Sequence, residues 1–546
     1  MRLAWGLIAA SFACAGAPPS TIASPSLSPT PVATATTGAP LILDIAAFND
    51  FHGNIEPPSE PWTTADGPVP AGGAAYLAAH LARLRGAVPH LIVASAGDMI
   101  GASPLASAML HDEPTIEAMS AAGVDLNTVG NHELDEGLDE LLRLLRGGCH
   151  PQDGCKGLDP WPGARFVTTA SNLWREGEKE TVFPASIVKE VEGVKVGFIG
   201  LALSSTPLHQ PVSFTGARFG AEAESANVEA RRLRALGIEA LIVVVHEGLI
   251  VSGDMNACDS PTGDLLPVLE TLDPSIDVVL SGHTHRAYVC RIAGKLVTSA
   301  GSYGRAYTHL RLALDRKTGD VAQVLEAKNV VVDHTIAPDA KVAAIVARWS
   351  ARAREVGDRV VGRVTATISR KSDANGVSPL GQLVADAQLF ATRDAGAEIA
   401  IMHARGLRTD IVLAPGGVTF AGIASVHPFS NHLVTVTVRG EDLLAFIEDS
   451  YTGEGEPRYL VPSSTLSWVW SAAAPHIDPK SVRIAGKPVD PKREYRLTIN
   501  DYLAGRGPLA KSTQARRGVT DAEALVRYFE TKSPIAPLLV ARVKKR

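Results

Sequence analysis

The stretch that decides the fold class lies at residues 41–53 and reads Leu-Ile-Leu-Asp-Ile-Ala-Ala-Phe-Asn-Asp-Phe-His-Gly. Its first eight residues are almost all apolar, as in a strand that is buried on both faces of a sheet. The segments that follow it, such as 74–85 and 221–236, have the spacing of amphipathic helices. This alternation predicts an α/β fold up to about residue 333. Further apolar runs occur at 91–94, 194–200, 241–245 and 278–280.

Polar side chains follow five strand-like runs directly, and most of them stand beside a glycine. In open α/β sheets, ligands bind at the carboxyl ends of the strands, and glycine lets the backbone turn sharply there. Any one of these segments could be a turn, a helix cap or a buried histidine, but five in succession indicate one site. They read Asn49-Asp50-Phe51-His52-Gly53, Ala96-Gly97-Asp98, Gly130-Asn131-His132-Glu133-Leu134-Asp135, His246-Glu247-Gly248 and Ser281-Gly282-His283-Thr284-His285.

The side chains in these segments are carboxylates, imidazoles and an amide, without a thiolate. Such ligands suit Zn, Mn, Fe or Co, and they disfavour a structural zinc site. Seven ligands are too many for one tetrahedral ion, but they suit two divalent ions that share a carboxylate. Two aspartates opposite two such ions leave positive charge that can hold a phosphate oxygen and acidify a water molecule. The pattern therefore predicts a two-metal phosphoesterase.

The five segments resemble the motifs of the calcineurin-like metallophosphoesterase superfamily. With its C-terminal half included, the chain resembles the bacterial 5'-nucleotidase / UDP-sugar hydrolase family from about residue 41 onward. The resemblance implies a four-layer αββα sandwich for the N-terminal domain. By the family pattern, the first metal site has the ligands Asp50, His52, Asp98 and His285, and the second has Asp98 as the bridge together with Asn131, His246 and His283.

His132 matches the catalytic histidine of this family, and Asp135 matches its orienting partner. A histidine beside the metals can donate a hydrogen bond to a phosphoryl oxygen as charge builds up in the transition state. A carboxylate on its other nitrogen fixes the tautomer and keeps the ring protonated. The alternative is that Asp135 caps a helix that begins nearby.

A second α/β domain starts near residue 362, and there the resemblance is weaker. Residues 378–387 resemble the family segment S/T-P-L-G-N-L-x-x-D-A, residues 427–431 resemble P-F-G-N, and residues 500–503 resemble N-D-F-L. The resemblance implies that Phe429 and Tyr502 form a clamp that stacks on a base, at on the order of 1–3 kcal/mol per contact. Alternatively, both are ordinary core aromatics.

The C-terminal half departs from the family pattern at positions expected to bind substrate. The usual N-G-G-x-R stretch keeps only Gly406 and Arg408, and an arginine of the family is Ala374 here. Arg370, four residues earlier, could take its place. The predicted substrate-binding residues are Arg370, Arg408, Phe429, Asn431 and Tyr502.

The N-terminus predicts export. Arg2 precedes an apolar stretch at 3–13, which is too short to span a bilayer and suits a signal peptide over residues 1–16. Cys14 stands where a bacterial lipoprotein carries its lipid, and the alternative is that it leaves with the signal peptide. Residues 17–40 are rich in Pro, Ser, Thr and Ala without charge, as in a disordered spacer. We expect a periplasmic protein, or one anchored to the cell envelope by a lipid.

Four cysteines remain after Cys14, and an even number in an exported chain favours disulfides. Four cysteines allow three connectivities. Pairing neighbours gives one disulfide between Cys149 and Cys155 and another between Cys258 and Cys290.

The predicted domains are a calcineurin-like metallophosphoesterase domain at 41–335, a helical connector at 336–360 and a substrate-recognition domain at 361–546. The formal net charge of -6 offers no basic surface for polymeric nucleic acid, so the expected partner is a small nucleotide or a related phosphate ester. The predicted function is release of phosphate from external nucleotides. Related enzymes would instead hydrolyse a cyclic nucleotide, a UDP-sugar or a sulfur ester. Two non-enzymatic functions also stay open, namely a lipid-anchored protein that binds nucleotides without turnover and an adhesive surface protein.

Overall fold

The computed structural model describes residues 39–64, 67–209, 216–427, 431–451, 460–504 and 507–546. Residues 40–546 form one compact unit. The predicted signal peptide, Cys14, Phe429 and the predicted spacer up to residue 38 lie outside the described residues. Among the helices in the described ranges, none combines the length and the apolar character that a membrane span requires.

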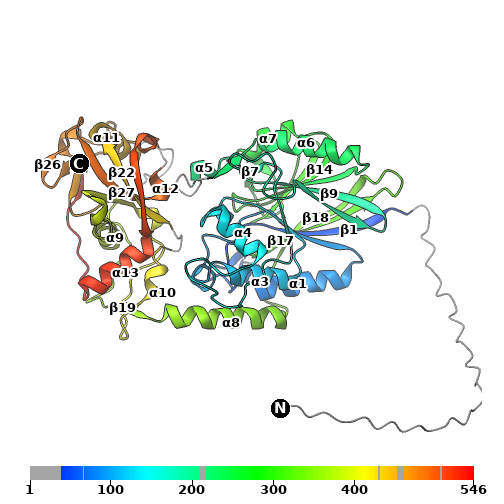
Figure 1. Cartoon of the computed structure of the whole chain (residues 1–546), viewed down its shortest axis with the longest axis horizontal. Helices are drawn as coiled ribbons and strands as arrows, with labels where there is room; N and C mark the ends of the chain where they lie inside the picture. The colour runs from blue at the N-terminus through cyan, green and yellow to red at the C-terminus, as the bar shows by residue number, and fades with distance from the viewer. Residues whose placement is uncertain (1–38, 65–66, 210–215, 428–430, 452–459, 505–506) are drawn as a thin grey trace, which may run out of the picture. The chain divides into compact units, whose positions relative to one another are not determined.

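The first sheet of the N-terminal domain contains the strand at 41–48 near its centre (Figure 1). Four of its strands run parallel, and the two at one edge are antiparallel to their neighbours. Their order is β18 (Val321–Val331), β17 (Ala306–Leu314), β1 (Leu41–Phe48), β4 (Leu91–Ser95), β5 (Leu126–Thr128) and β6 (Val167–Thr169).

The second sheet also has six strands. Its four central strands are parallel, and each edge strand is antiparallel to its neighbour. Their order is β15 (Ala287–Ile292), β16 (Lys295–Ala300), β14 (Ile276–Ser281), β11 (Ala240–Val245), β9 (Val194–Leu201) and β8 (Ser186–Val191).

Strand β1 shows why the apolar runs do not alternate with polar residues. Leu43 and Ile45 pack in the layer between the two sheets, where they share a core with Phe198 of the second sheet. Ala46 and Phe48 point the other way, into the core beneath the helices. A strand covered on both faces needs apolar residues at successive positions.

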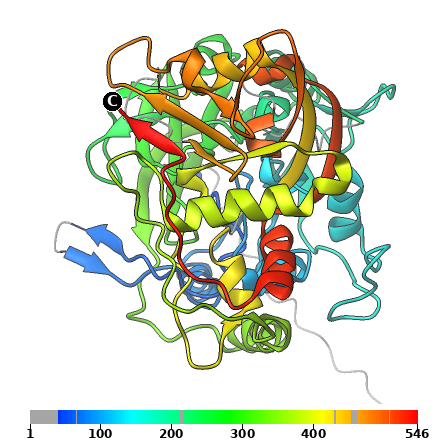
Figure 2. The same ribbon diagram turned by 90° about the vertical axis from the view of Figure 1, so that its left-hand side faces the viewer.

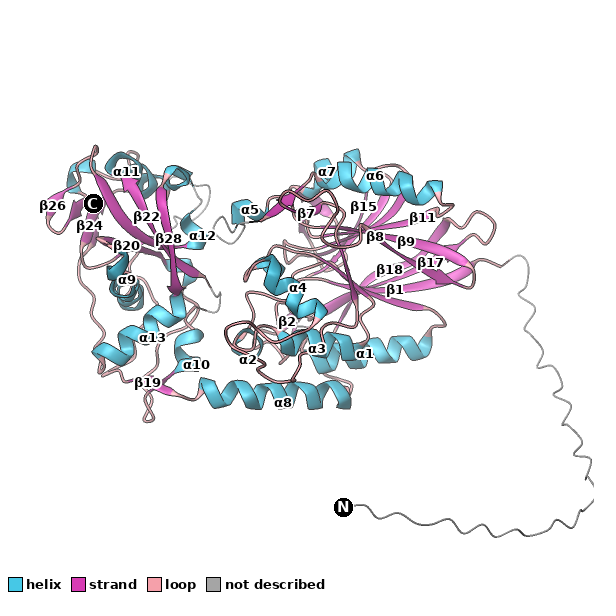
Figure 3. Ribbon diagram, in the orientation of Figure 1, coloured by secondary structure: helices cyan, strands magenta, loops and turns pink. Residues whose placement is uncertain are grey.

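Helices cover the outer face of each sheet, which completes the predicted four-layer αββα sandwich (Figure 3). The fold class predicted from the sequence is therefore confirmed. The helices on the first sheet include α1 (Ala74–Ala87), α3 (Glu113–Ala122) and α4 (Leu138–Arg146), and those on the second are α6 (Glu222–Ala235) and α7 (Leu265–Thr271). Shorter elements are α2 (Leu105–Ala108), α5 (Thr206–His209) and the strand pairs β2 (Trp62–Thr64) with β3 (Gly67–Val69), β7 (Leu173–Arg175) with β10 (Ala217–Phe219) and β12 (Ile250–Ser252) with β13 (Asp259–Thr262).

Helix α8 (Ala340–Gly357) lies within the segment predicted as a helical connector. Asp339 caps it by accepting a hydrogen bond from the backbone N–H of Val342 at 2.9 Å. Its apolar face belongs to the core beneath α1 and α3, and Trp349 Nε1 donates to Glu117 Oε2 at 2.7 Å. The connector is therefore packed along the N-terminal domain.

The C-terminal domain is built on a five-stranded sheet, across which helix α9 (Pro379–Ala391) lies (Figure 2). Helix α9 contacts the strands β20 (Ile399–His403), β23 (Leu460–Pro462) and β27 (Glu494–Asn500). Ser378 caps α9, and Pro379 occupies its first turn. The strand order is β23 (Leu460–Pro462), β20 (Ile399–His403), β27 (Glu494–Asn500), β22 (His432–Arg439) and β28 (Thr513–Thr520). A four-stranded sheet has the order β26 (Lys487–Pro488), β25 (Arg483–Ile484), β24 (Leu466–Trp470) and β29 (Val543–Lys545). The remaining strands and α-helices in the described part of this domain are β19 (Val360–Gly362), β21 (Val418–Thr419), α10 (Phe420–Ala424), α11 (Gly440–Asp449), α12 (Asp501–Ala504) and α13 (Asp521–Lys532).

The disulfides in the structure are the two expected from pairing neighbours. Cys149 bonds to Cys155 and closes a short loop after α4, and Cys258 bonds to Cys290 on β15.

Candidate metal centre

The predicted metal ligands gather where the carboxyl ends of five strands meet. Three of these strands belong to the first sheet and two belong to the second. Ligand atoms of Asp50, His52 and His285 lie within 4.8 Å of one another, as do those of Asp98, His246 and His283. Asn131 directly precedes His132, whose backbone N–H donates to Asp98 Oδ1 at 2.8 Å. The structure thus brings all seven predicted ligands to one edge of the sandwich.

Backbone carbonyls orient two of the histidine rings. His52 Nδ1 lies 2.9 Å from the carbonyl oxygen of Gly101, and His246 Nδ1 lies 2.8 Å from that of Ala96. Because a carbonyl can only accept, Nδ1 donates in both rings and Nε2 faces the site. Nε2 of His246 lies 3.0 Å from Asp98 Oδ2, and Nε2 of His52 lies 3.7 Å from the same oxygen. Both rings therefore present their second nitrogen to one carboxylate.

Asp50 has one oxygen held by the protein and one turned to the histidines. Its Oδ2 accepts from Asn49 Nδ2 at 2.7 Å and from the backbone N–H of His283 at 2.9 Å. Its Oδ1 lies 3.2 Å from His285 Nε2 and 3.7 Å from His52 Nε2. Burial acts to raise the pKa of Asp50, but the surrounding histidines outweigh it and hold this pKa well below its usual range. The carboxylate is therefore ionised.

Asp98 belongs to the second group of ligands and also faces His52 of the first. Its Oδ2 faces His52 and His246, and its Oδ1 accepts from the turn that carries His132. Burial acts to raise the pKa of Asp98, and the charge of His246 outweighs it and lowers this pKa strongly. The same ion pair raises the pKa of His246 to about 10, against burial, which alone would lower it. The buried carboxylates at the centre of the site therefore attract cations.

Five of the predicted ligands adopt a left-handed backbone that is uncommon outside glycine. Such a conformation costs about 1–3 kcal/mol per residue and collects at functional sites. Of the thirteen non-glycine residues with positive φ in the described ranges, five belong to this cluster. They are Asp50 at 49°, His52 at 46°, Asp98 at 50°, His283 at 70° and His285 at 56°.

The donor set fits divalent metal ions. Three buried ligand atoms, Asp50 Oδ1, Asn131 Oδ1 and His246 Nε2, complete no hydrogen bond with any residue in the described part of the chain. Buried polar atoms of this kind are costly unless they are satisfied, and a bound cation would satisfy all three. Imidazole, carboxylate and amide oxygen are ligands of Zn, Mn, Fe and Co.

His132 lies beside this cluster, since its ligand atom is within 4.8 Å of those of His52 and Asp98, and with Asp135 it has the geometry of the predicted dyad. His132 Nδ1 is 3.0 and 3.1 Å from the two carboxylate oxygens of Asp135, and the rings of His132 and His52 meet edge to face at 5.1 Å. Burial acts to lower the pKa of His132, but the charges of Asp135 and Asp98 outweigh it and raise this pKa to about 9. Asp135 does not cap α4, which was the alternative role predicted for it, because the N-cap position of α4 is Gly137.

Comparison with known proteins identifies the family. The calcineurin-like phosphoesterase family matches residues 43–287, and the C-terminal domain family of 5'-nucleotidases matches residues 360–511. The chain belongs to the 5'-nucleotidase family of metallophosphoesterases. Both the family and the need for divalent metal ions, as predicted from the sequence, are confirmed.

The relatives of this chain include proteins of different sizes. It is 32% identical to the endonuclease YhcR of Bacillus subtilis over 92% of this chain, but it spans only 41% of that protein's length. It is 29% identical to the cell wall protein Lmo0130 of Listeria monocytogenes over 92% of this chain and 69% of that protein. Its fold matches the 5'-nucleotidase precursor of Thermus thermophilus with a TM-score of 0.66 at 23% identity, covering 92% of this chain and 99% of that structure.

Four of the five predicted substrate residues lie in the described part of the chain. Arg370 and Arg408 are both exposed, and Arg370 Nη1 donates to the carbonyl of Leu407, next to Arg408, at 3.5 Å. Tyr502 is 39% exposed, and its ring meets that of His403 at 5.1 Å with a tilt of 31°. The carbonyl of Asn431 accepts from the N–H that opens α13 at 2.9 Å. Phe429, the other half of the predicted clamp, lies outside the described residues.

Glu133 stands inside the motif that follows β5, yet its role is not evident from the sequence. Its carboxylate accepts the backbone N–H groups of Asp98 at 2.9 Å, Met99 at 2.8 Å and Gly130 at 2.7 Å. It thereby ties the loop after β4 to the loop after β5. Its position between Asn131 and Asp135 is the sequence feature that could have indicated a supporting role for Glu133.

Tyr303 is a second supporting residue that was not predicted from the sequence. Its backbone N–H donates to the carbonyl of Asp50 at 2.7 Å, and its ring lies 5.4 Å from that of His285. It follows β16, which is parallel to β14 and therefore ends at the same edge. Strand β16 is buried along its whole length, but it reads Lys-Leu-Val-Thr-Ser-Ala, so only the glycines of Gly301-Ser302-Tyr303-Gly304 resemble the pattern that locates the other five segments.

Proposed function

We propose that this chain hydrolyses phosphate esters of nucleotides at two divalent ions. In this proposal Asp50, His52, Asp98 and His285 hold the first ion, and Asp98 also belongs to the second. Asn131, His246 and His283 complete the second set. Such ions neutralise the charge of a phosphate ester and make a water molecule acidic enough to deprotonate near neutral pH. Zn, Mn, Fe and Co all suit these ligands.

The observation that carries the proposal is the His132–Asp135 pair beside the seven ligands. Asp135 accepts from Nδ1 of His132, so the Nε2–H end of the ring is left to act on substrate. Since the nearby carboxylates keep the ring protonated, Nε2 can donate to a phosphoryl oxygen as its charge grows. A protein that only bound nucleotides would not need this dyad.

The C-terminal domain is proposed to recognise the rest of the substrate. Arg370 and Arg408 are exposed cations of the kind that bind phosphate groups, and the part-exposed ring of Tyr502 suits stacking on a base with Phe429. Asn431 directly precedes β22 and belongs to the same proposed recognition surface. We assign the phosphoesterase domain to 41–335, the connector to 336–360 and the recognition domain to 361–546.

An exported, envelope location is also proposed. It is supported by the signal-like residues 1–16, by the two disulfides, and by the name of the Listeria relative, a cell wall protein. Lipid on Cys14 would anchor the chain, and mass spectrometry of the mature N-terminus tests this directly.

The function is tested by phosphate release from AMP, ATP, UDP-glucose and cyclic AMP, with enzyme reconstituted with Zn or Mn. His132→Ala should lose on the order of 10²–10³ in kcat while it keeps two ions per chain. The matched control is His90→Ala, which removes an ion-paired histidine ahead of β4, and this variant should keep wild-type activity. Full activity of His132→Ala would remove the dyad from the mechanism.

A further inference from the structure

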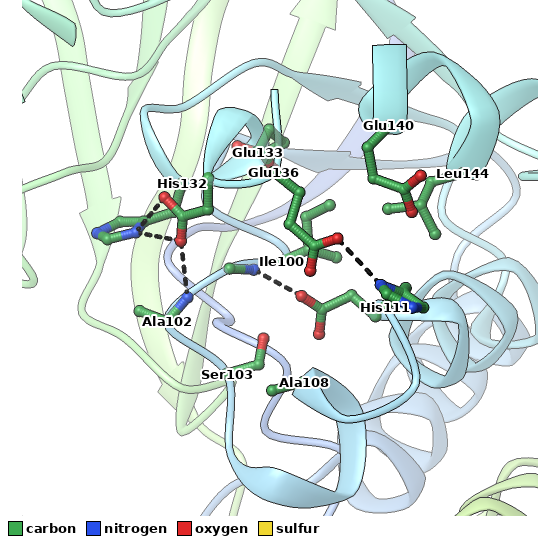
Figure 4. A pocket seen from close by; sticks show the side chains of 13 residues that line it. Ile100, Ala102, Ser103, Ala108, His111, His132, Glu133, Glu136, Glu140 and Leu144 are labelled. Carbon is green, nitrogen blue, oxygen red and sulfur yellow. Dashed lines mark hydrogen bonds and ion pairs between the residues drawn. The ribbon is translucent and has the colours of Figure 1, made fainter. Parts of the chain in front are cut away.

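A second histidine lies across a small cavity from the catalytic dyad. Its lining includes His132, Asp135, His111 and Glu136. Figure 4 shows His132 and His111 on opposite sides, with Glu136 between them. His111 Nδ1 lies 3.0 Å from Glu136 Oε2, and its Nε2 lies 2.9 Å from Asp153 Oδ2. Because an ionised carboxylate can only accept, both ring nitrogens carry protons and the ring is a cation.

The two carboxylates that His111 joins belong to different segments. Glu136 directly follows Asp135, and Asp153 lies in the loop closed by the disulfide between Cys149 and Cys155. His150 of the same loop stacks on His111, with ring centroids 3.9 Å apart and planes 10° apart. His150 Nδ1 also accepts from the backbone N–H of Asp153 at 3.1 Å, which holds the loop in place.

Residues 135–137 form the turn between the short 3-10 helix at His132–Leu134 and α4. Asp135 accepts from the N–H of Ala102 at 3.1 Å, and the N–H of Gly137 donates to the carbonyl of Leu134 at 2.9 Å. Gly137 has a φ of 92°, a conformation that other residues rarely adopt. The ion pair with His111 therefore links Glu136, which directly follows Asp135 in this turn, to Asp153 in the disulfide-closed loop.

We propose that His111 is a positioning residue for the dyad: its cation ties Glu136, and with it the turn that carries Asp135, to the disulfide-closed loop. The proposal deepens the function proposed above and rests on it, since the dyad is given a catalytic role there. His111 does not touch the reacting atoms and acts only through Glu136.

The charged groups around His111 set the pH range over which this contact exists. Burial acts to lower the pKa of His111, but the hydrogen bonds to Glu136 and Asp153 outweigh it and raise this pKa to about 8. The contact is therefore complete below the unfolded pKa of about 6.5 and is lost as pH rises through about 8. The titratable groups that act on His111 are Glu136 on the turn that carries Asp135, Asp153 and His150 on the loop, Glu140 on α4 and Glu113 on α3. The nearest cations pair with these carboxylates: Lys156, just after the loop, lies 3.5 Å from Asp153, and Arg143 of α4 pairs with Glu140 and Glu113.

The test compares wild type, His111→Gln and His111→Arg by kcat for AMP from pH 6 to about 10. At pH 7, His111→Gln should lose about tenfold in kcat with KM and metal content unchanged, because a small displacement of a catalytic group costs up to about 10²-fold. His111→Arg carries a permanent cation, so it should keep most of kcat at pH 7 and should lack the wild-type decline near pH 8. A purely structural role would not move this pH profile.

Hydrogen exchange gives a readout that does not depend on turnover. Amide exchange at 134–138 should quicken in His111→Gln and stay near wild type in His111→Arg at pH 7. Wild-type kcat in His111→Gln, or equal exchange in all three proteins, would overturn the proposal. Loss of one metal ion per chain from His111→Gln would also overturn it, because His111 would then be a metal ligand. Absence of turnover in wild type would instead refute the proposed function, while the exchange comparison would still decide whether His111 holds the turn.

Discussion

Replacing Gly130 by alanine should displace Asp98, the carboxylate proposed to bridge the two ions. A Cβ atom at position 130 would lie 2.2 Å from Asp98 Oδ1 and 2.6 Å from its backbone nitrogen. Ordinary contacts of a Cβ begin at 3.4 Å, so the carboxylate must retreat by about 1.2 Å, the difference between 3.4 and 2.2. The φ of Gly130 is not left-handed, so space alone is at issue.

A shift of this size exceeds what a metal site tolerates, since ligand distances are held within about 0.2 Å. We expect Gly130→Ala to bind fewer than two ions and to lose about 100-fold in kcat/KM, which is about 2.7 kcal/mol of transition-state stabilisation. Overpacking should also destabilise the fold by about 1–3 kcal/mol. The measurements are elemental analysis, kcat/KM for AMP and urea unfolding on the same preparation.

The matched control is Gly86→Ala on α1, where an added Cβ meets nothing within 4 Å. This variant should keep its activity and gain up to about 1 kcal/mol of stability, because alanine favours the helix. If Gly130→Ala bound two ions and stayed within threefold of wild-type kcat/KM, the steric argument for Asp98 as the bridge would fail.

Three further predictions concern stability. His427 is buried, and burial lowers its pKa to about 4, so the unfolded chain binds the proton first. The free energy of unfolding should therefore fall by up to about 3 kcal/mol in wild type as the pH is lowered from 6.5 to 4, and it should fall by less in His427→Gln. Urea titrations in which both proteins lose the same free energy of unfolding would contradict this. The double variant Cys258→Ala and Cys290→Ala removes the disulfide that joins residues 32 positions apart, and it should lower the free energy of unfolding by about 4 kcal/mol. An unchanged denaturation midpoint would contradict this prediction. Removing metal with a chelator should lower Tm, and adding Mn at about 100 times its Kd should restore about 2.7 kcal/mol of the free energy of unfolding. A Tm that does not change when metal is removed or added would argue against the metal site.

The strands and their polar ends could be predicted because that information is local. A strand buried on both faces is a continuous apolar run, and the chain turns directly after it. Asp50, Asp98 and His246 can therefore be recognised as strand-end residues from a short segment of sequence. The partners that orient them are not local. The N–H that fixes Asp50 Oδ2 belongs to His283, which is 233 residues away, and Ala96, which orients His246, is 150 residues away.

The C-terminal domain could be predicted less completely because its side chains carry no such pattern. An exposed Arg370 or Arg408 looks the same in sequence whether it binds phosphate or only water. The contact between Tyr502 and His403 joins α12 to β20, elements far apart along the chain, and no short-range spacing indicates it.

The fold class, the family and the seven candidate ligands could be predicted from the sequence, because strand burial and the chemistry of strand ends are encoded in consecutive residues. Which oxygen of each aspartate faces the site, and which ring nitrogens point inward, became known from the packed sheets. The tertiary structure alone also revealed the supporting contacts of Glu133, Tyr303 and His111. These depend on hydrogen bonds and ion pairs between segments that meet only after the sheets have packed, and their directions cannot be read from the order of residues.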